Sequence, residues 1–149
     1  MKTEEILTLL REKIYELKKK EELNFKEIIK HETNFRGKKG VLEHPGCYVI
    51  YEKEKPIYVG SAGKGKHVLK YRMGDLFFYS PQARDSKFKH TLTNKLLTHK
   101  EHKRFSKIDE VRDFYLNSCS VKVIETDTVE QARLIESALI LKLNPKYNA

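Results

Sequence analysis

Apolar residues recur every three or four positions in residues 3–20, and this spacing predicts an amphipathic helix. A second helix is predicted to begin at residues 24–27 (NFKE), where Asn24 is a suitable N-cap and a glutamate follows three residues later. The glycine-containing segment FRGKKG then interrupts the helical pattern. We therefore expect residues 1–39 to form a helical N-terminal extension and residues 40–149 to form the main domain.

Two short apolar runs stand close together, GCYVIY at 46–51 and PIYVG at 56–60, and the charged link EKEK separates them. The pattern predicts a β-hairpin with one tyrosine in each strand, Tyr48 and Tyr58. If the turn consists of the three residues EKE, the two tyrosines face each other directly on one side of the sheet. If the turn consists of all four residues, they lie on opposite faces, and the spacing alone leaves both arrangements open.

Downstream of the hairpin, the same kinds of pattern predict one more strand and several helices. CSVKVIET at 119–126 alternates as a third strand does. Residues 128–143 predict a well-defined helix, because its first residues form a capping box and a proline follows its end. Other helices are predicted at 87–100, at 107–117 and from near His67 onward. This order of elements predicts a small α/β (α+β) domain, in which helices flank a three-stranded antiparallel sheet.

The formal net charge of +9 is concentrated in the middle of the chain. Residues 36–107 hold 17 Lys/Arg and 6 Asp/Glu, whereas the rest of the chain holds 13 and 15. A concentrated positive charge favours a polyanionic partner such as nucleic acid. The alternative is a lysine-rich surface that serves only to keep the protein in solution.

Other classes of protein fit this sequence poorly. No apolar run reaches the roughly 18 residues of a membrane-spanning helix, so we expect no contact with a membrane. The first twenty residues are charged throughout, unlike a secretory signal. The only two cysteines, Cys47 and Cys119, lie in apolar contexts and cannot form a zinc cluster by themselves. We therefore expect a cytoplasmic protein in a reducing environment.

The hairpin motifs resemble the signature of the GIY-YIG nuclease superfamily, since GCY is followed ten residues later by YVG. The resemblance continues downstream with Arg72 in a predicted helix, Glu136 inside an apolar helix and Asn148 in the terminal NPKYN. Family members carry an arginine, a glutamate and an asparagine in the same order, so the resemblance covers residues 46–149. It departs from the family at Cys47, where an aliphatic residue is usual. The resemblance implies a metal-dependent endonuclease that hydrolyses phosphodiester bonds in DNA.

The resemblance also implies a role for each of these residues. Tyr48 is expected to act as the general base, and Tyr58 to hold the attacking water or its neighbour. Arg72 is expected to bind the phosphate, because a planar guanidinium forms paired hydrogen bonds with phosphate oxygens. Glu136 is expected to bind one divalent ion, Mg²⁺ or Mn²⁺, together with waters and the substrate phosphate. Asn148 is expected to support the tyrosines by hydrogen bonding.

Each of these assignments has a structural alternative. Tyrosine pairs across strands are common sheet stabilisers. Arg72 is also compatible with an ordinary helix surface, and Glu136 with a solvated helix face. Lys70 competes with Arg72 for the phosphate-binding role. Asn144 competes with the terminal asparagine, although it stands where the last helix ends and is better placed to cap that helix.

The segment between the hairpin and the arginine contains GKGK, which suits either a phosphate-contacting loop or a flexible surface loop. His90, on a basic helix, is a further candidate for assistance at a phosphate. The alternative to the nuclease is a non-catalytic nucleic-acid-binding module that keeps the same fold. The N-terminal helices are interpreted as packing elements or as a candidate dimerisation element, and the oligomeric state is left open. Candidate contacts to the DNA backbone are Lys64, Lys66, Lys70, Arg84, Lys87, Lys89 and Lys95.

Overall fold

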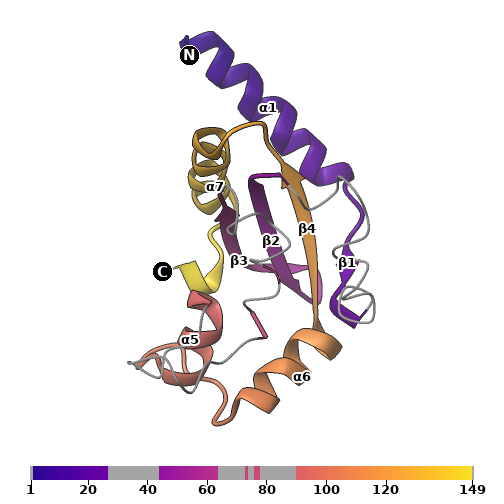
Figure 1. Cartoon of the computed structure of the whole chain (residues 1–149), viewed down its shortest axis with the longest axis vertical. Coiled ribbons are helices and arrows are strands. Elements are labelled where there is room, and N and C mark those ends of the chain that lie inside the picture. Colours follow the sequence, from indigo (N-terminus) through magenta and orange to yellow (C-terminus); the bar gives the residue numbers. More distant parts are fainter. Residues whose placement is uncertain (1, 27–43, 64–72, 74–75, 78–89, 149) are drawn as a thin grey trace.

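The protein is built around an antiparallel sheet of four strands in the order β1-β4-β2-β3, with helices packed around it (Figure 1). The strands are β1 (Leu23–Asn24), β2 (Gly46–Glu52), β3 (Lys55–Ala62) and β4 (Cys119–Glu125). This arrangement confirms the predicted fold class and the three strands expected from the sequence. The computed structural model describes residues 2–26, 44–63, 73, 76–77 and 90–148.

The fourth strand, β1, is the one that the sequence did not predict. Leu23 pairs with Val121 of β4, and Asn24 pairs with the residue before it. The chain becomes helical directly afterwards, and the Asn24 side chain accepts a hydrogen bond of 2.8 Å from the backbone N–H of Lys26. The predicted capping contact of Asn24 is therefore present, but Asn24 is also the last residue of β1, which lengthens the sheet by one strand.

Four α-helices and a short 3-10 helix are seen in the described part of the chain. They are α1 (Thr3–Lys19), α5 (Thr91–Thr98), α6 (Ile108–Ser118), α7 (Val129–Leu143) and η2 (Lys146–Asn148). Their bounds follow the helices expected from the sequence closely. The helix expected from near His67 lies outside the described residues, except for Met73. None of the described helices is long and apolar enough to cross a membrane.

Alternating residues of the strands face two separate hydrophobic clusters. One cluster packs helices α1 and α7 against β2, β3 and β4, and we call this side of the sheet the α1–α7 face. The other cluster packs α5, α6 and η2 against the opposite side, the α5–α6 face. Cys47 and Val49 of β2 point to the α1–α7 face, while Tyr48 and Ile50 point to the α5–α6 face. The two sides of one strand thus serve two different layers.

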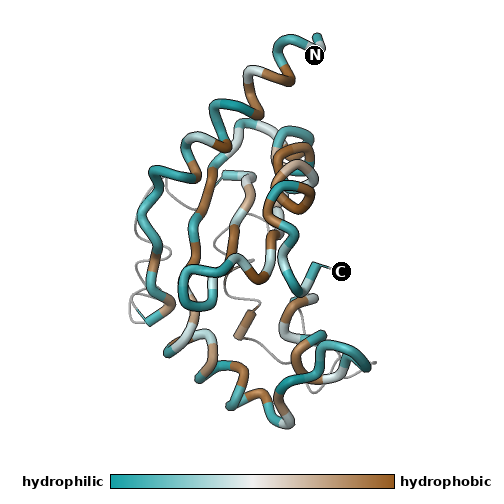
Figure 2. The backbone as a smooth tube through the Cα atoms, turned by 180° about the vertical axis from the view of Figure 1, so that it is seen from behind, coloured by the Kyte–Doolittle hydropathy of each residue, from teal (hydrophilic) through white to brown (hydrophobic). Residues whose placement is uncertain are grey.

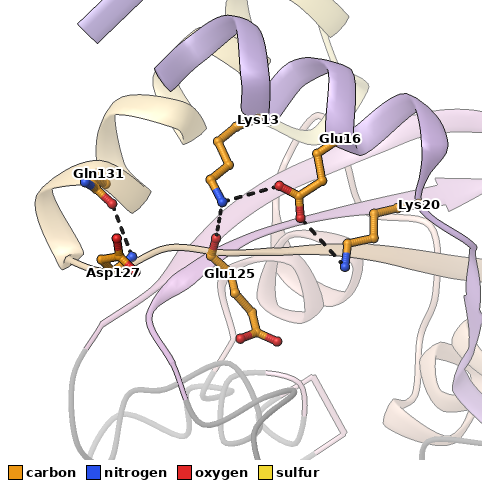
Figure 3. A network of polar contacts seen from close by, with 6 residues as sticks. All are labelled: Lys13, Glu16, Lys20, Glu125, Asp127 and Gln131. Atoms are coloured by element: carbon orange, nitrogen blue, oxygen red, sulfur yellow. Dashed lines mark hydrogen bonds and ion pairs between the residues drawn. The ribbon is translucent and has the colours of Figure 1, made fainter. Parts of the chain in front are cut away.

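Helix α1 belongs to the core of the α1–α7 face. Its hydrophobic positions alternate with hydrophilic ones along the helix, as Figure 2 shows, and Leu17 is buried against the sheet. Polar contacts tie the same helix to the end of β4 (Figure 3): Lys13 donates a hydrogen bond of 3.0 Å to the carbonyl oxygen of Glu125 and lies 3.3 Å from Glu16. The predicted domain boundary between residues 39 and 40 lies outside the described residues.

The hairpin has a different turn from either of the two considered in the sequence. Glu52 pairs with Lys55, so the turn has two residues, Lys53 and Glu54, with φ angles of 48° and 68°. Positive φ at both central positions is the geometry of a type I′ turn, which matches the twist of the strands. Continued without interruption, this register would pair Tyr48 with Val59 and would turn the two tyrosines to opposite faces.

A β-bulge in β3 restores the shared face of the tyrosines. The register shifts between Ile50 and Tyr51, which pair with Tyr58 and Pro56, so Ile57 is the extra residue. Proline is tolerated here because β3 is an edge strand and the bulge interrupts the ladder. As a result Tyr48 pairs with Gly60, and Tyr58 lies diagonally across from Tyr48 on the same side of the sheet.

Candidate active site

Tyr48 lies inside the α5–α6 face, where its side chain is only 1% exposed. Its ring lies directly over Gly60, the residue opposite it in β3. A Cβ at position 60 would collide with the hydroxyl oxygen and Cζ of Tyr48 and would lie 2.9 Å from Cε2. The glycine of the YVG motif therefore has a spatial explanation, because any side chain at that position displaces the phenol ring.

Tyr58 lies beside Tyr48, with the two ring centroids 6.3 Å apart and the ring planes at 36°. Both hydroxyl-bearing rings belong to the same buried cluster, and Tyr58 is 8% exposed. The two rings lie beside each other because the bulge at Ile57 places them on the same face of the sheet. The structure thus brings the two tyrosines together as a diagonal pair, which the sequence left open.

His90 joins the two tyrosines and is completely buried. It is the N-cap of α5, and its Nδ1 atom accepts a hydrogen bond of 3.0 Å from the backbone N–H of Leu92. Its Nε2 atom lies 2.6 Å from the hydroxyl oxygen of Tyr48. The ring centroids of His90 and Tyr58 are 5.5 Å apart in an edge-on arrangement. The sequence suggested His90 only as an aid at a phosphate. The predicted helix at 87–100 placed His90 inside the helix, whereas α5 begins at the next residue, so the capping of backbone N–H groups by His90 was missed.

Asn148 returns the C-terminal segment to the outer edge of β3. Its side-chain oxygen accepts a hydrogen bond of 2.8 Å from the N–H of Val59, and its side-chain nitrogen donates one of 2.8 Å to the carbonyl of the same residue. Val59 stands between Tyr58 and Gly60, so this contact fixes the backbone of the YVG motif. Asn144 instead forms the left-handed C-cap of α7, with φ 47°, as its position at the helix end suggested.

Lys95 is held beside this C-terminal segment. Its ammonium group donates a hydrogen bond of 2.8 Å to the carbonyl oxygen of Tyr147 in η2. It is the single candidate DNA contact that lies among the described residues. Outside the described residues lie Arg72, Lys64, Lys66, Lys70, Arg84, Lys87 and Lys89.

Glu136 is half-buried on α7, in the layer on the other side of the sheet from the tyrosine rings. Glu136 acts electrostatically on Cys47 of β2, whose thiol donates a hydrogen bond of 2.7 Å to the carbonyl oxygen of Ala132. Burial and, to a smaller extent, the negative charge of Glu136 together raise the pKa of the Cys47 thiol to about 12. Cys47 and Tyr48 are consecutive residues of β2, so their side chains point to opposite faces of the sheet. No described contact therefore joins Glu136 directly to the tyrosines.

Among the described residues, the metal donor that Glu136 offers is a single carboxylate. Within the part of the chain that the structure describes, no three His, Cys, Asp or Glu side chains gather in a way that could hold a metal ion. A single carboxylate fits Mg²⁺, because this ion keeps several of its waters and takes the remaining ligands from one or two carboxylates and a substrate phosphate. The residues present therefore suit a metal that is shared with the substrate, and do not suit a closed structural site.

Comparisons with known proteins give matches among solved structures only. No protein-family model matches the chain, and no curated protein matches it either. The chain is similar to the GIY-YIG N-terminal endonuclease domain of UvrC from Thermotoga maritima, bound to its catalytic divalent cation, magnesium. The TM-score is 0.44 and the identity 23%, over 78% of this chain and 97% of that chain. Two point mutants of that domain, also bound to the cation, match with the same TM-score of 0.44 at 23% and 22% identity, over 78% of this chain and 96% of theirs. The likeness to these structures concerns the fold.

Proposed function

We propose that this chain is a metal-dependent endonuclease of GIY-YIG type, which hydrolyses phosphodiester bonds in DNA. The observation that carries the proposal is the buried cluster of Tyr48, Tyr58 and His90 around Gly60. Tyr48 has its hydroxyl oxygen 2.6 Å from His90 Nε2, and the glycine beneath its ring leaves room for no side chain. A phenol fixed by a hydrogen bond and by close packing is a group placed for proton transfer.

In this mechanism Tyr48, as the phenolate, takes a proton from the attacking water. The water oxygen forms a bond to phosphorus, the bond to the leaving oxygen breaks, and the leaving oxygen takes a proton from solvent. Tyr58 orients the water beside Tyr48, and Asn148 keeps the β3 backbone in register through Val59. Arg72 binds the phosphate oxygens. A divalent ion held by Glu136 supplies positive charge to the pentavalent phosphate when bound.

The proposed substrate follows from the distribution of charge. Residues 36–107 carry the basic surplus of the chain, and lysines supply phosphate contacts that give affinity and salt dependence without reading the sequence. Cys47 and Cys119 are buried and form no disulfide, in keeping with a reducing, cytoplasmic setting.

The proposal is tested by incubating the purified chain with labelled single-stranded, duplex and branched DNA, in Mg²⁺, Mn²⁺ or EDTA. We expect cleavage that requires a divalent ion and that disappears in Tyr48→Phe and Glu136→Ala. Tyr51→Phe is the matched control for the first variant, because Tyr51 lies in the same strand but faces the α1–α7 side. Glu130→Ala, in an exposed position of α7, is the control for the second. Both controls should cleave as the wild type does.

One observation favours the alternative, a nucleic-acid-binding module without catalysis. Glu136 and the tyrosines are carried by opposite sides of the sheet, and a binder has no need to bring them together. Salt-dependent binding of DNA without cleavage of any substrate would support this alternative. Full activity of Glu136→Ala would leave the nuclease in place but would contradict the metal-binding role of Glu136.

A further inference from the structure

His90 is a buried polar side chain whose two ring nitrogens both have partners, and the two partners differ in kind. Buried polar groups normally have all their hydrogen bonds made, so the partners report which ring nitrogen carries the proton. His90 is 0% exposed, and its ring lies among the rings of Tyr48 and Tyr58 at centroid distances of 5.9 and 5.5 Å. Such a ring has little freedom to rotate.

The beginning of α5 sets the tautomer of this ring. Because Nδ1 accepts the N–H of Leu92 at 3.0 Å, Nδ1 carries no proton and the ring is neutral. The proton of a neutral imidazole is then on Nε2, which faces the hydroxyl oxygen of Tyr48 at 2.6 Å. The opposite tautomer would place two N–H groups against each other at the helix cap. The hydrogen bond therefore runs from His90 Nε2–H to the oxygen of Tyr48.

We propose that His90 is a positioning residue for Tyr48, an inference that rests on the proposed nuclease function. Its Nε2–H holds the phenol oxygen in one place and directs the hydroxyl proton of Tyr48 away from the imidazole. When that proton is absent, the same hydrogen bond stabilises the negative charge on the oxygen. Helix α5 thus acts on Tyr48 through a cap whose direction is fixed by the backbone.

Two substitutions test the roles of the two ring nitrogens of His90 separately. His90→Asn keeps an oxygen at the place of Nδ1 and a good N-cap, but removes the group that reaches Tyr48. His90→Gln places an amide N–H near the position of Nε2, but loses the cap. If His90 positions Tyr48, His90→Asn lowers kcat by ~10²-fold with KM nearly unchanged. His90→Gln keeps kcat within ~10-fold of the wild type.

The stability of the two variants should follow the reverse order. His90→Asn retains the cap and should melt at a higher temperature than His90→Gln. If His90 served only to stabilise the fold, the more stable variant, His90→Asn, would also be the more active one. That result, or an equal loss of kcat in His90→Asn and His90→Gln, would overturn the proposal.

A second measurement does not depend on DNA cleavage. In the ¹⁵N-labelled chain, NMR should show His90 as the neutral ring with its proton on Nε2. Tyr48→Phe should shift the Nε2–H resonance and leave the amide of Leu92 almost unmoved. A proton on Nδ1, or no response to Tyr48→Phe, would contradict the inference even if the protein cleaves DNA. Failure of the wild type to cleave, with the Nε2–H contact present, would contradict the nuclease function and leave the contact itself established.

Discussion

The two faces of the central sheet are filled with different chemistry. On the α1–α7 face, aliphatic residues such as Ile135 and Leu139 of α7 pack on Val49 and Ile124 of the sheet. On the α5–α6 face, aliphatic residues pack together with aromatic rings such as Tyr48 and Tyr115, and His90 is a buried polar side chain on this side. Both sides of the same strands therefore supply apolar area, and the α5–α6 face adds fixed hydrogen bonds between buried side chains.

The buried polar groups that the structure describes on the α5–α6 face have hydrogen-bond partners. Thr93 of α5 donates a hydrogen bond of 2.8 Å to the carbonyl oxygen of Leu76 and accepts one of 2.8 Å from the hydroxyl of Tyr115. Burial raises the pKa of the Tyr115 phenol above its ordinary value. Among the described residues, no buried side-chain nitrogen or oxygen lacks a hydrogen-bond partner. Aliphatic packing tolerates exchange of similar volumes, whereas a paired polar network specifies one arrangement. The difference between the faces predicts that substitutions on one side change stability and that substitutions on the other change activity.

The largest expected effect on stability is at the α1–α7 face. Leu139→Ala removes a fully buried side chain from α7 and should lower the free energy of unfolding by about 2–5 kcal/mol. Cleavage per folded molecule should stay close to that of the wild type. Leu141→Ala, two residues away and 86% exposed, is the matched control and should change stability by less than about 0.5 kcal/mol. Urea unfolding and a cleavage assay below the unfolding transition measure the two quantities. Loss of activity in folded Leu139→Ala would remove the distinction between the faces.

A smaller effect on stability, with a larger effect on activity, is expected at the α5–α6 face. Gly60→Ala forces the Tyr48 ring out of its place and should cost about 1–3 kcal/mol of stability. Because the phenol oxygen then leaves His90, cleavage should fall by more than the stability change explains. The double-mutant cycle with Tyr48→Ala measures the clash directly, since Gly60→Ala should cost little once the ring is absent. Equal costs in both backgrounds would show that the ring does not set the requirement for glycine.

The smallest effect is expected beside the α5–α6 cluster, where Arg104 lies over the ring of Phe114 and forms a paired salt bridge with Glu52. Both N···O distances are 2.9 Å. The hydrogen bonds from Arg104 hold the pKa of Glu52 below its ordinary value of 4.5. The pair therefore stabilises the fold above that pH, and its contribution is lost as the pH falls below it.

The pH dependence is measured with Glu52→Gln. This variant should lose about 0.5–1 kcal/mol of stability at neutral pH, and the difference from the wild type should shrink as the pH falls below about 4.5. Asp109→Asn is the control, because Asp109 is 82% exposed and meets Arg112 through one contact of 3.4 Å. Its loss at neutral pH should be smaller. A constant difference between Glu52→Gln and the wild type across the acidic range would rule out the ionised pair as its cause.

The sequence was sufficient for the elements whose signals are local. Helix α7 has its start and stop signals within a few residues, and Thr128 accepts a hydrogen bond from the N–H of Gln131 as predicted. The predicted capping box is not closed on Thr128, because the Gln131 side chain accepts its hydrogen bond from the N–H of Asp127. Strands β2 and β4 follow from their apolar patterns in the same way. The assignment of Asn144 to the helix end also rests on local information, since a left-handed C-cap favours asparagine or glycine.

The features that were missed depend on residues far apart in the sequence. Strand β1 has two residues and exists only because β4 offers its edge. The hairpin turn uses Lys53 and Glu54 at positive φ, where asparagine and glycine are the usual signals. His90 meets Tyr48 across 42 positions of sequence, and its proton is set by an amide at Leu92. A single sequence contains no direct signal for such a contact, because pairing geometry is fixed only when the layers assemble.

Because of the bulge at Ile57, whether the two tyrosines share a face depends on whether the number of residues between them is odd or even. Removing one residue from β3 before Tyr58 while a bulge is kept would turn every later side chain of the strand to the other face. Removing Ile57 itself would take the bulge away and leave Tyr58 opposite Ile50, as it is now. Removing or adding two residues would preserve the occupants. Length variation among chains of this kind should therefore occur in even steps between Tyr48 and Tyr58, or in odd steps only where a bulge appears or disappears with them.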